Sequence, residues 1–66
     1  MNIKLKTFFI YLAYGTALTV IDVDTDEEVK NTDSFTVPYT IPTGYENATV
    51  ECVGIIDNRM YIWIKR

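Results

Sequence analysis

The most regular pattern in the chain is the alternation of side chains near its C-terminal end. In Arg59–Lys65 the apolar positions fall into two sets: Met60, Ile62 and Ile64 against Tyr61 and Trp63. A period of two is typical of a β-strand, whose successive side chains point to opposite faces of a sheet. Both sets are apolar, so we expect one face of this strand to line the core and the other to need a cover.

Other segments also have strand patterns. Thr16–Val23 alternates, and Ala48–Ile56 is rich in β-branched residues. Glu27–Thr32 is a polar strand, and we expect it at a sheet edge because its charges discourage the addition of another strand. Asn2–Lys6 is expected to form a short strand or an extended lead-in.

Turn chemistry separates these segments. Asp24-Thr25-Asp26 predicts a turn, because aspartate side chains bond the backbone two residues further on. Asp57-Asn58 predicts a two-residue hairpin loop with positive φ. Phe35–Ile41 is expected to be extended, because Pro38 and Pro42 exclude a central strand there.

One helix is predicted near the N-terminus, over Thr7–Tyr14. Thr7 can cap its first turn, and Gly15 favours its end. The apolar stripe that indicates helical periodicity is Phe8, Phe9, Leu12 and Ala13. These elements predict an α+β domain, with one short N-terminal helix packed on a small, mostly antiparallel sheet of about four to five strands.

Length and charge narrow the class of protein. The 66 residues form one small domain, residues 1–66, and a core of this size favours a homo-oligomer. Six basic and nine acidic residues give a net charge of −3, which argues against direct nucleic-acid binding. Thr7–Ile21 is interrupted by threonines and a glycine, so we expect neither a leader nor a membrane segment. A lone cysteine forms no internal disulfide, which favours a cytoplasmic location.

Nothing in the sequence indicates catalysis or a resident cofactor. The chain has no histidine, and Cys52 is expected to be a small buried side chain without a base beside it. Glu46 and Glu51 lie near the aromatic strand in sequence, but nothing selects them as an acid–base pair. We therefore expect a protein that is not an enzyme.

The acidic run at Asp22, Asp24 and Asp26 superficially opens like a calcium-binding loop. Such a loop requires a glycine where this chain has Glu27, and a glutamate where this chain has Asp33. The run is therefore expected to be a solvated turn without a metal ion. It is also a possible mimic of nucleic-acid phosphate.

Tyr61 and Trp63 are the first candidate ligand-binding residues. Three roles are open for them: packing under the helix, forming a subunit interface, or stacking on a ligand ring. Arg59 is two positions before Tyr61, where it can hold a phosphate beside the ring or simply solvate the hairpin end.

A second candidate group lies in the loop that contains both prolines. The hydroxyls of Tyr39, Thr40 and Tyr45 can bond a sugar or phosphate. The alternative is that the prolines fix a crossing connection and Tyr39 fills the core.

The order of elements resembles that of small uncharacterised proteins from Firmicutes phages and prophages. The residues that carry the resemblance are Leu12-Ala13-Tyr14-Gly15-Thr16, then Leu18, Val20 and Asp22, then Val37-Pro38-Tyr39, and finally Ile62-x-Ile64. The resemblance implies a phage product in the cytoplasm of a bacterial host, and it transfers no activity.

These observations lead to a functional hypothesis of stoichiometric binding. The first form is a counter-defence protein that sequesters a nucleotide-like immune signal at an oligomer interface, with aromatic side chains stacking on the base. In it, Arg59, Lys30 or backbone amides hold the phosphate. The alternatives are an inhibitor of a host defence effector such as a CRISPR nuclease, and a structural or accessory phage protein.

Overall fold

One sheet and one short helix make up the part of the chain that the structure describes. The structure is a computed structural model, and it describes residues 3–12, 17–33 and 41–66. Its elements in chain order are β1 (Ile3–Lys4), α1 (Leu5–Ile10), β2 (Leu18–Asp22), β3 (Glu27–Thr32), β4 (Thr49–Ile56) and β5 (Arg59–Lys65). No helix in these residues is long and apolar enough to cross a membrane. The predicted α+β class is confirmed, with a helix that is very short.

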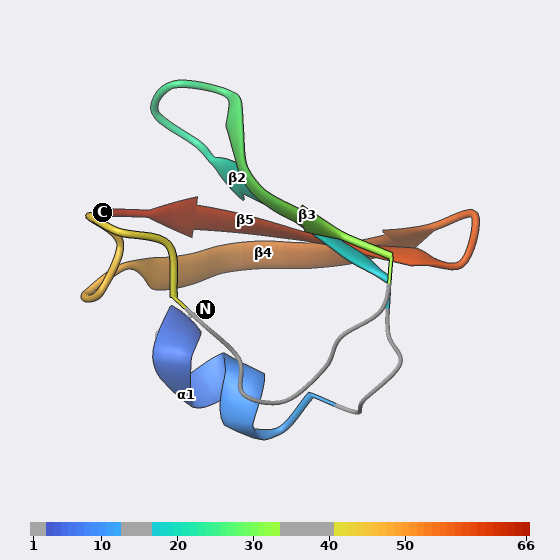
Figure 1. Cartoon of the computed structure of the whole chain (residues 1–66), viewed down its shortest axis with the longest axis horizontal. Helices are drawn as coiled ribbons and strands as arrows, with labels where there is room; N and C mark the ends of the chain where they lie inside the picture. Colours follow the sequence, from blue (N-terminus) through green and yellow to red (C-terminus); the bar gives the residue numbers. More distant parts are fainter. Residues whose placement is uncertain (1–2, 13–16, 34–40) are drawn as a thin grey trace.

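The described strands form one sheet in the order β1-β4-β5-β2-β3. Neighbouring strands are antiparallel except for β2 and β5, which are parallel and place Val20 beside Ile62. The polar strand β3 lies at an edge, as its charges predicted. Figure 1 shows the β2–β3 hairpin rising from the side of the sheet that faces away from α1.

Both predicted turns are confirmed. The Asp22 carboxylate accepts the backbone N–H of Asp24 at 2.8 Å, and Asp26 closes this turn with a φ of 60°. Asp57 and Asn58 have φ values of 52° and 65°, the left-handed pair that a tight two-residue hairpin requires.

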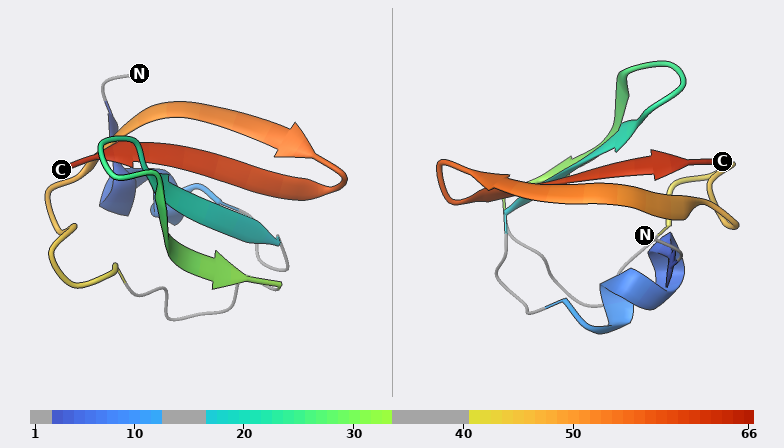
Figure 2. Two further views of the ribbon diagram at one scale, coloured as in Figure 1. Left: turned by 90° about the horizontal axis from the view of Figure 1, so that it is seen from above. Right: turned by 180° about the vertical axis from the view of Figure 1, so that it is seen from behind.

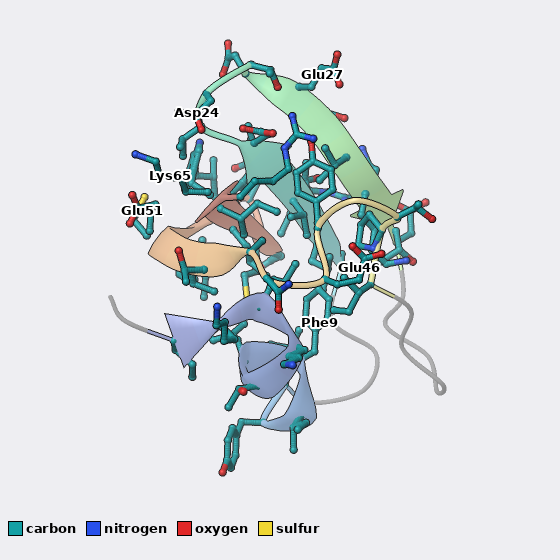
Figure 3. The ribbon with its side chains drawn as sticks, turned by 90° about the vertical axis from the view of Figure 1, so that its left-hand side faces the viewer. Phe9, Asp24, Glu27, Glu46, Glu51 and Lys65 are labelled. Carbon is teal, nitrogen blue, oxygen red and sulfur yellow. The ribbon has the colours of Figure 1, made fainter. Side chains whose placement is uncertain are left out.

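The core lies between α1 and one face of the sheet (Figures 1 and 2). Phe9 points from α1 toward the sheet (Figure 3). Ile62 and Ile64 of β5 are fully buried in this core. The other buried hydrophobic residues are Leu5, Leu18, Val20, Tyr45, Ala48 and Val50. This face of the sheet is the one predicted to line the core.

The helix begins and ends earlier than the sequence predicted. It starts at Leu5, directly after β1, and no side chain caps it, so the predicted cap by Thr7 is wrong. The N–H of Leu5 donates instead to the carbonyl of Ala48 at 2.9 Å, because β1 holds this end of the helix against β4. The helix ends at Ile10, and the predicted end at Gly15 lies outside the described residues.

Cys52 is exposed, so the prediction of a buried thiol is wrong. The register that runs from the Asp57–Asn58 turn sets the position of Cys52, and the pairing of β4 with β5 shifts by one residue between Val50 and Cys52. Val50 remains opposite Ile64 in the core, whereas Cys52 lies opposite Trp63. A shift of one residue exchanges the two faces of a strand, so Val50 points into the core and Cys52 points away from it.

Candidate functional site

The side of the sheet that faces away from α1 is the candidate functional surface, and we call it the open face. No helix packs on it, and the β2–β3 hairpin rises from one part of it (Figures 1 and 2). Strand register places on it Thr19, Ile21, Cys52, Gly54, Ile56, Arg59, Tyr61 and Trp63. It is the second apolar face that the sequence predicted would need a cover.

Tyr61 and Trp63 form the centre of the open face. Their rings stack with centroids 6.0 Å apart and planes inclined by 27°. Both are half-buried and point away from Ile62 and Ile64, which contact the helix layer. The expectation that they pack beneath the helix is therefore wrong, because α1 packs on the other set of alternating side chains.

Gly54 lies beside the larger of the two rings. It lies opposite Tyr61 on β4, and a Cβ added to it would lie 3.6 Å from the Trp63 ring. On the other side, Ile21 of β2 lies beside Trp63 and is half-buried. The aromatic pair is thus flanked by a glycine on one strand and an isoleucine on another, which leaves ring surface facing outward.

Arg59 lies at the end of the open face next to the Asp57–Asn58 turn. Its guanidinium is already hydrogen-bonded to other groups of the chain. Its Nη1 donates to the carbonyls of Leu18 and Thr32 at 3.0 and 3.1 Å. The same nitrogen lies 3.2 Å from the Thr19 hydroxyl and 2.9 Å from the Asn31 side-chain oxygen. These contacts tie β5 across β2 to β3.

The charge of Arg59 is also balanced within the chain. Its Nη2 pairs with the carboxylate of Asp33, a side chain that is 93% exposed. The Arg59 side chain is 23% exposed. Arg59 therefore links β5 to β2 and β3 through hydrogen bonds. To hold a phosphate, its guanidinium would have to give up these hydrogen bonds and its ion pair with Asp33.

Tyr45 lies on the opposite side of the sheet from Tyr61 and Trp63. Its hydroxyl donates to the buried carboxylate of Asp22 at 2.7 Å, and Arg66 Nε lies 3.5 Å from the same carboxylate. The guanidinium of Arg66 also lies 4.9 Å from the centre of the Tyr45 ring. The Tyr45 hydroxyl predicted to bond a ligand is used inside the fold.

These contacts set the protonation of the Asp22–Tyr45 pair. The hydrogen bond from Tyr45 and the N–H of Asp24 hold the pKa of Asp22 below its ordinary value, although burial opposes them. The same hydrogen bond, with burial, raises the pKa of Tyr45. A carboxylate and a neutral phenol are thus stabilised together.

The other acidic side chains do not form a catalytic or metal-binding group among the described residues. Figure 3 shows Glu46 and Glu51 on different sides of the molecule. Glu46 accepts the N–H of Gly44, and backbone hydrogen bonds lower its pKa. Asp24 and Glu27 lie exposed at the tip of the β2–β3 hairpin (Figure 3). No group of three or more metal-ligating side chains occurs in the parts of the chain that the structure describes.

Four of the six predicted site residues lie in the described part of the chain, and these four are dispersed. Tyr61 and Trp63 lie together on the open face, Arg59 lies on the same strand but is occupied, and Tyr45 lies on the core side. Tyr39 and Thr40 lie outside the described residues.

The structural roles of two residues, Gly54 and Asp22, were not predicted from the sequence. The position of Gly54 beside the Trp63 ring depends on the β4–β5 register, which follows from the tight turn at Asp57 and Asn58. The role of Asp22 as a buried acceptor had a local signal in the Asp-x-Asp turn, but its phenol partner is distant in the sequence.

Comparisons with protein-family models, with curated proteins and with solved structures found no significant match to this chain.

Proposed function

We propose that this chain acts by stoichiometric binding and that it covers a partner protein with its open face. The observation that carries the proposal is the stacked, half-buried pair Tyr61–Trp63 on a sheet face on which no described helix packs. In the phage setting that the resemblance suggests, the partner class is a host defence effector.

The composition of the open face supports a protein partner. Protein interfaces combine an aromatic or apolar centre with a polar rim, and tyrosine, tryptophan and arginine are enriched in them. Here Tyr61 and Trp63 form the centre, and the Arg59–Asp33 pair lies at one end. The face is built from paired strands, so little backbone ordering is needed when a partner binds.

A nucleotide-like ligand enclosed between copies of the chain is the second candidate. The outward ring surface of the Tyr61–Trp63 pair favours it, because aromatic faces stack on any base. The electrostatics favour it less. Arg59 is already paired with Asp33, and the chain carries a net charge of −3, which opposes a polyanionic phosphate chain.

The test is affinity capture from a bacterial lysate with matched variants, followed by binding measurements on the purified pair. Trp63→Ala removes the centre of the open face, and Tyr11→Ala is the control, since Tyr11 is 80% exposed on the helix side. We expect a protein bound in a fixed ratio by the wild type and by Tyr11→Ala, with binding weakened at least tenfold in Trp63→Ala. Circular dichroism of each variant verifies that it remains folded.

Two outcomes contradict the proposal. Equal binding by Trp63→Ala and the wild type places the partner on another surface. A bound mass of a few hundred daltons in native mass spectrometry, lost in Trp63→Ala, replaces the protein partner with the second candidate.

A further inference from the structure

Strand β4 has an edge that is only partly paired. It runs from Thr49 to Ile56, but β1 pairs only with Thr49 and Val50. From Glu51 to Ile56, no strand among the described residues pairs with this side of β4. Unpaired backbone N–H and C=O groups along such an edge form a template for another strand.

The two edges of the sheet differ in their protection. The β3 edge carries Glu27, Glu28 and Lys30, charges of the kind that discourage strand addition. Residues 52–56 of the β4 edge carry no charge and no proline. Ile55 and Ile56 are 70% and 56% exposed, although each is a large aliphatic side chain in a strand. Residues 52–56 thus lack the charges and prolines that discourage edge-to-edge pairing, whereas Glu51 and the irregularity beside Cys52 lie at one end of this edge.

We propose that a second copy of this chain pairs with the free edge of β4, antiparallel and about a twofold axis at Gly54. This step does not rest on the proposed function of the open face. The pairing of the two β4 strands joins the two sheets edge to edge. The twofold axis is perpendicular to the joined sheet, so the two Tyr61–Trp63 pairs lie on the same side of it.

The register follows from the free length of the edge. A twofold axis perpendicular to a sheet keeps each face on its own side, so a residue must lie at the centre. Centring on Val53 would place the second copy's Ile56 against Val50, which β1 already pairs. Centring on Ile55 would place hairpin residues Asp57 and Asn58 opposite the strand.

Centring on Gly54 uses the free edge fully. Val53 then faces the second copy's Ile55, Cys52 faces its Ile56, and the two Gly54 residues face each other. The exposed isoleucines gain apolar neighbours, which is the stabilising element of cross-strand pairs. The register also brings Glu51 near the second copy's Asp57 at each end, and this like-charge contact weakens the association.

Measuring mass against concentration by sedimentation equilibrium tests the interface. We expect the wild type to shift from monomer to dimer as concentration rises, and Ile55→Lys to remain a monomer, because a charged edge opposes pairing. Ile10→Lys is the matched control, since Ile10 is 76% exposed on α1, and it should dimerise like the wild type. A wild type that stays monomeric at millimolar concentration, or equal effects of the two lysines, overturns the proposal.

Two further variants test the register. Glu51→Lys replaces the like-charge contact by an attractive one, and should tighten the dimer severalfold. Gly54→Cys in a Cys52→Ser background should form a disulfide between copies under mild oxidation, and Ile10→Cys in the same background should not. The added side chain fits, because the Trp63 ring lies at ordinary contact distance from it. No cross-link, or equal cross-linking at both positions, contradicts the Gly54 axis.

The two proposals fail independently. Trp63→Ala leaves the β4 edge intact and should still dimerise, whereas Ile55→Lys leaves the Tyr61–Trp63 pair intact and should still bind a partner at the open face.

Discussion

The hydroxyl of Tyr45 donates a 2.7 Å hydrogen bond to the carboxylate of Asp22, a side chain with no exposed surface. The two residues are distant in the chain, and their contact fixes the loop before β4 against the end of β2. Arg66 adds an ion pair to the same carboxylate and contacts the Tyr45 ring. A buried carboxylate is tolerated only where hydrogen bonds and opposite charge satisfy it, so this pair is a structural element of the fold.

This contact predicts how stability depends on pH at the acidic end. The folded-state pKa of Asp22 lies below the ordinary value of about 3.9, so its contribution is present above that pH and is lost as pH falls through the lower pKa. The melting temperature of the wild type should therefore fall steeply below about pH 4. In Asp22→Asn this part of the fall should be absent, because an amide does not titrate.

Variants of Tyr45 and Glu46 test whether Asp22 is the group responsible for this pH dependence. Tyr45→Phe removes the hydroxyl that most lowers the pKa of Asp22, so its acid-induced loss of stability should be smaller than in the wild type and should end at higher pH. Glu46→Gln removes another carboxyl with a lowered pKa but leaves the Asp22–Tyr45 contact intact. If all four proteins lose stability over the same pH range, Asp22 is not the group that titrates.

The second prediction concerns Arg59 as a tie between strands. Arg59→Met keeps much of the aliphatic length but leaves the carbonyls of Leu18 and Thr32 without this donor. Buried or half-buried groups that lose a partner cost about 1–3 kcal/mol, so we expect a loss of that size in the free energy of unfolding. Lys65→Met, at the exposed end of the same strand, should change it by less than about 0.5 kcal/mol. Urea denaturation of both variants measures the difference, and equal effects would contradict the assigned role.

Much of the fold was predictable because its signals are local. The alternation in Arg59–Lys65, the charges of Glu27–Thr32 and the turn residues Asp57 and Asn58 each act over a few neighbouring positions, and each matches the structure. The helix was misplaced because its start depends on a tertiary bond, from Leu5 to Ala48, that no local pattern contains.

The site was harder to predict for the same reason. The sequence showed that Tyr61 and Trp63 share a face, but not that this face lies away from the helix. That outcome depends on strand order and on the parallel pairing of β2 with β5. Arg59 looked like a free cation because its acceptors lie on two other strands.

The third prediction compares the two faces of β5 directly. Ile62 is fully buried in the core, so Ile62→Ala should cost about 2–5 kcal/mol. Trp63 is larger but only half-buried on the open face, so Trp63→Ala should cost less than Ile62→Ala. Urea denaturation measures both. A greater loss from Trp63→Ala would mean that the open face is covered in solution.

The last prediction tests the β4–β5 hairpin through its turn. Asn58 has a φ of 65°, a left-handed conformation that glycine adopts without the steric cost borne by other residues. Asp-Gly is a favoured pair for such a two-residue loop, so Asn58→Gly should raise stability, by at most about 1 kcal/mol. Asn58→Val, with a branched Cβ in the same conformation, should lower it. Thermal unfolding measures both changes. The hairpin joins β4, which has the free edge, to β5, which carries Tyr61 and Trp63. A stabilised turn should leave both binding surfaces unchanged. A destabilised Asn58→Gly variant would mean that asparagine contributes a contact through its side chain that outweighs the backbone preference.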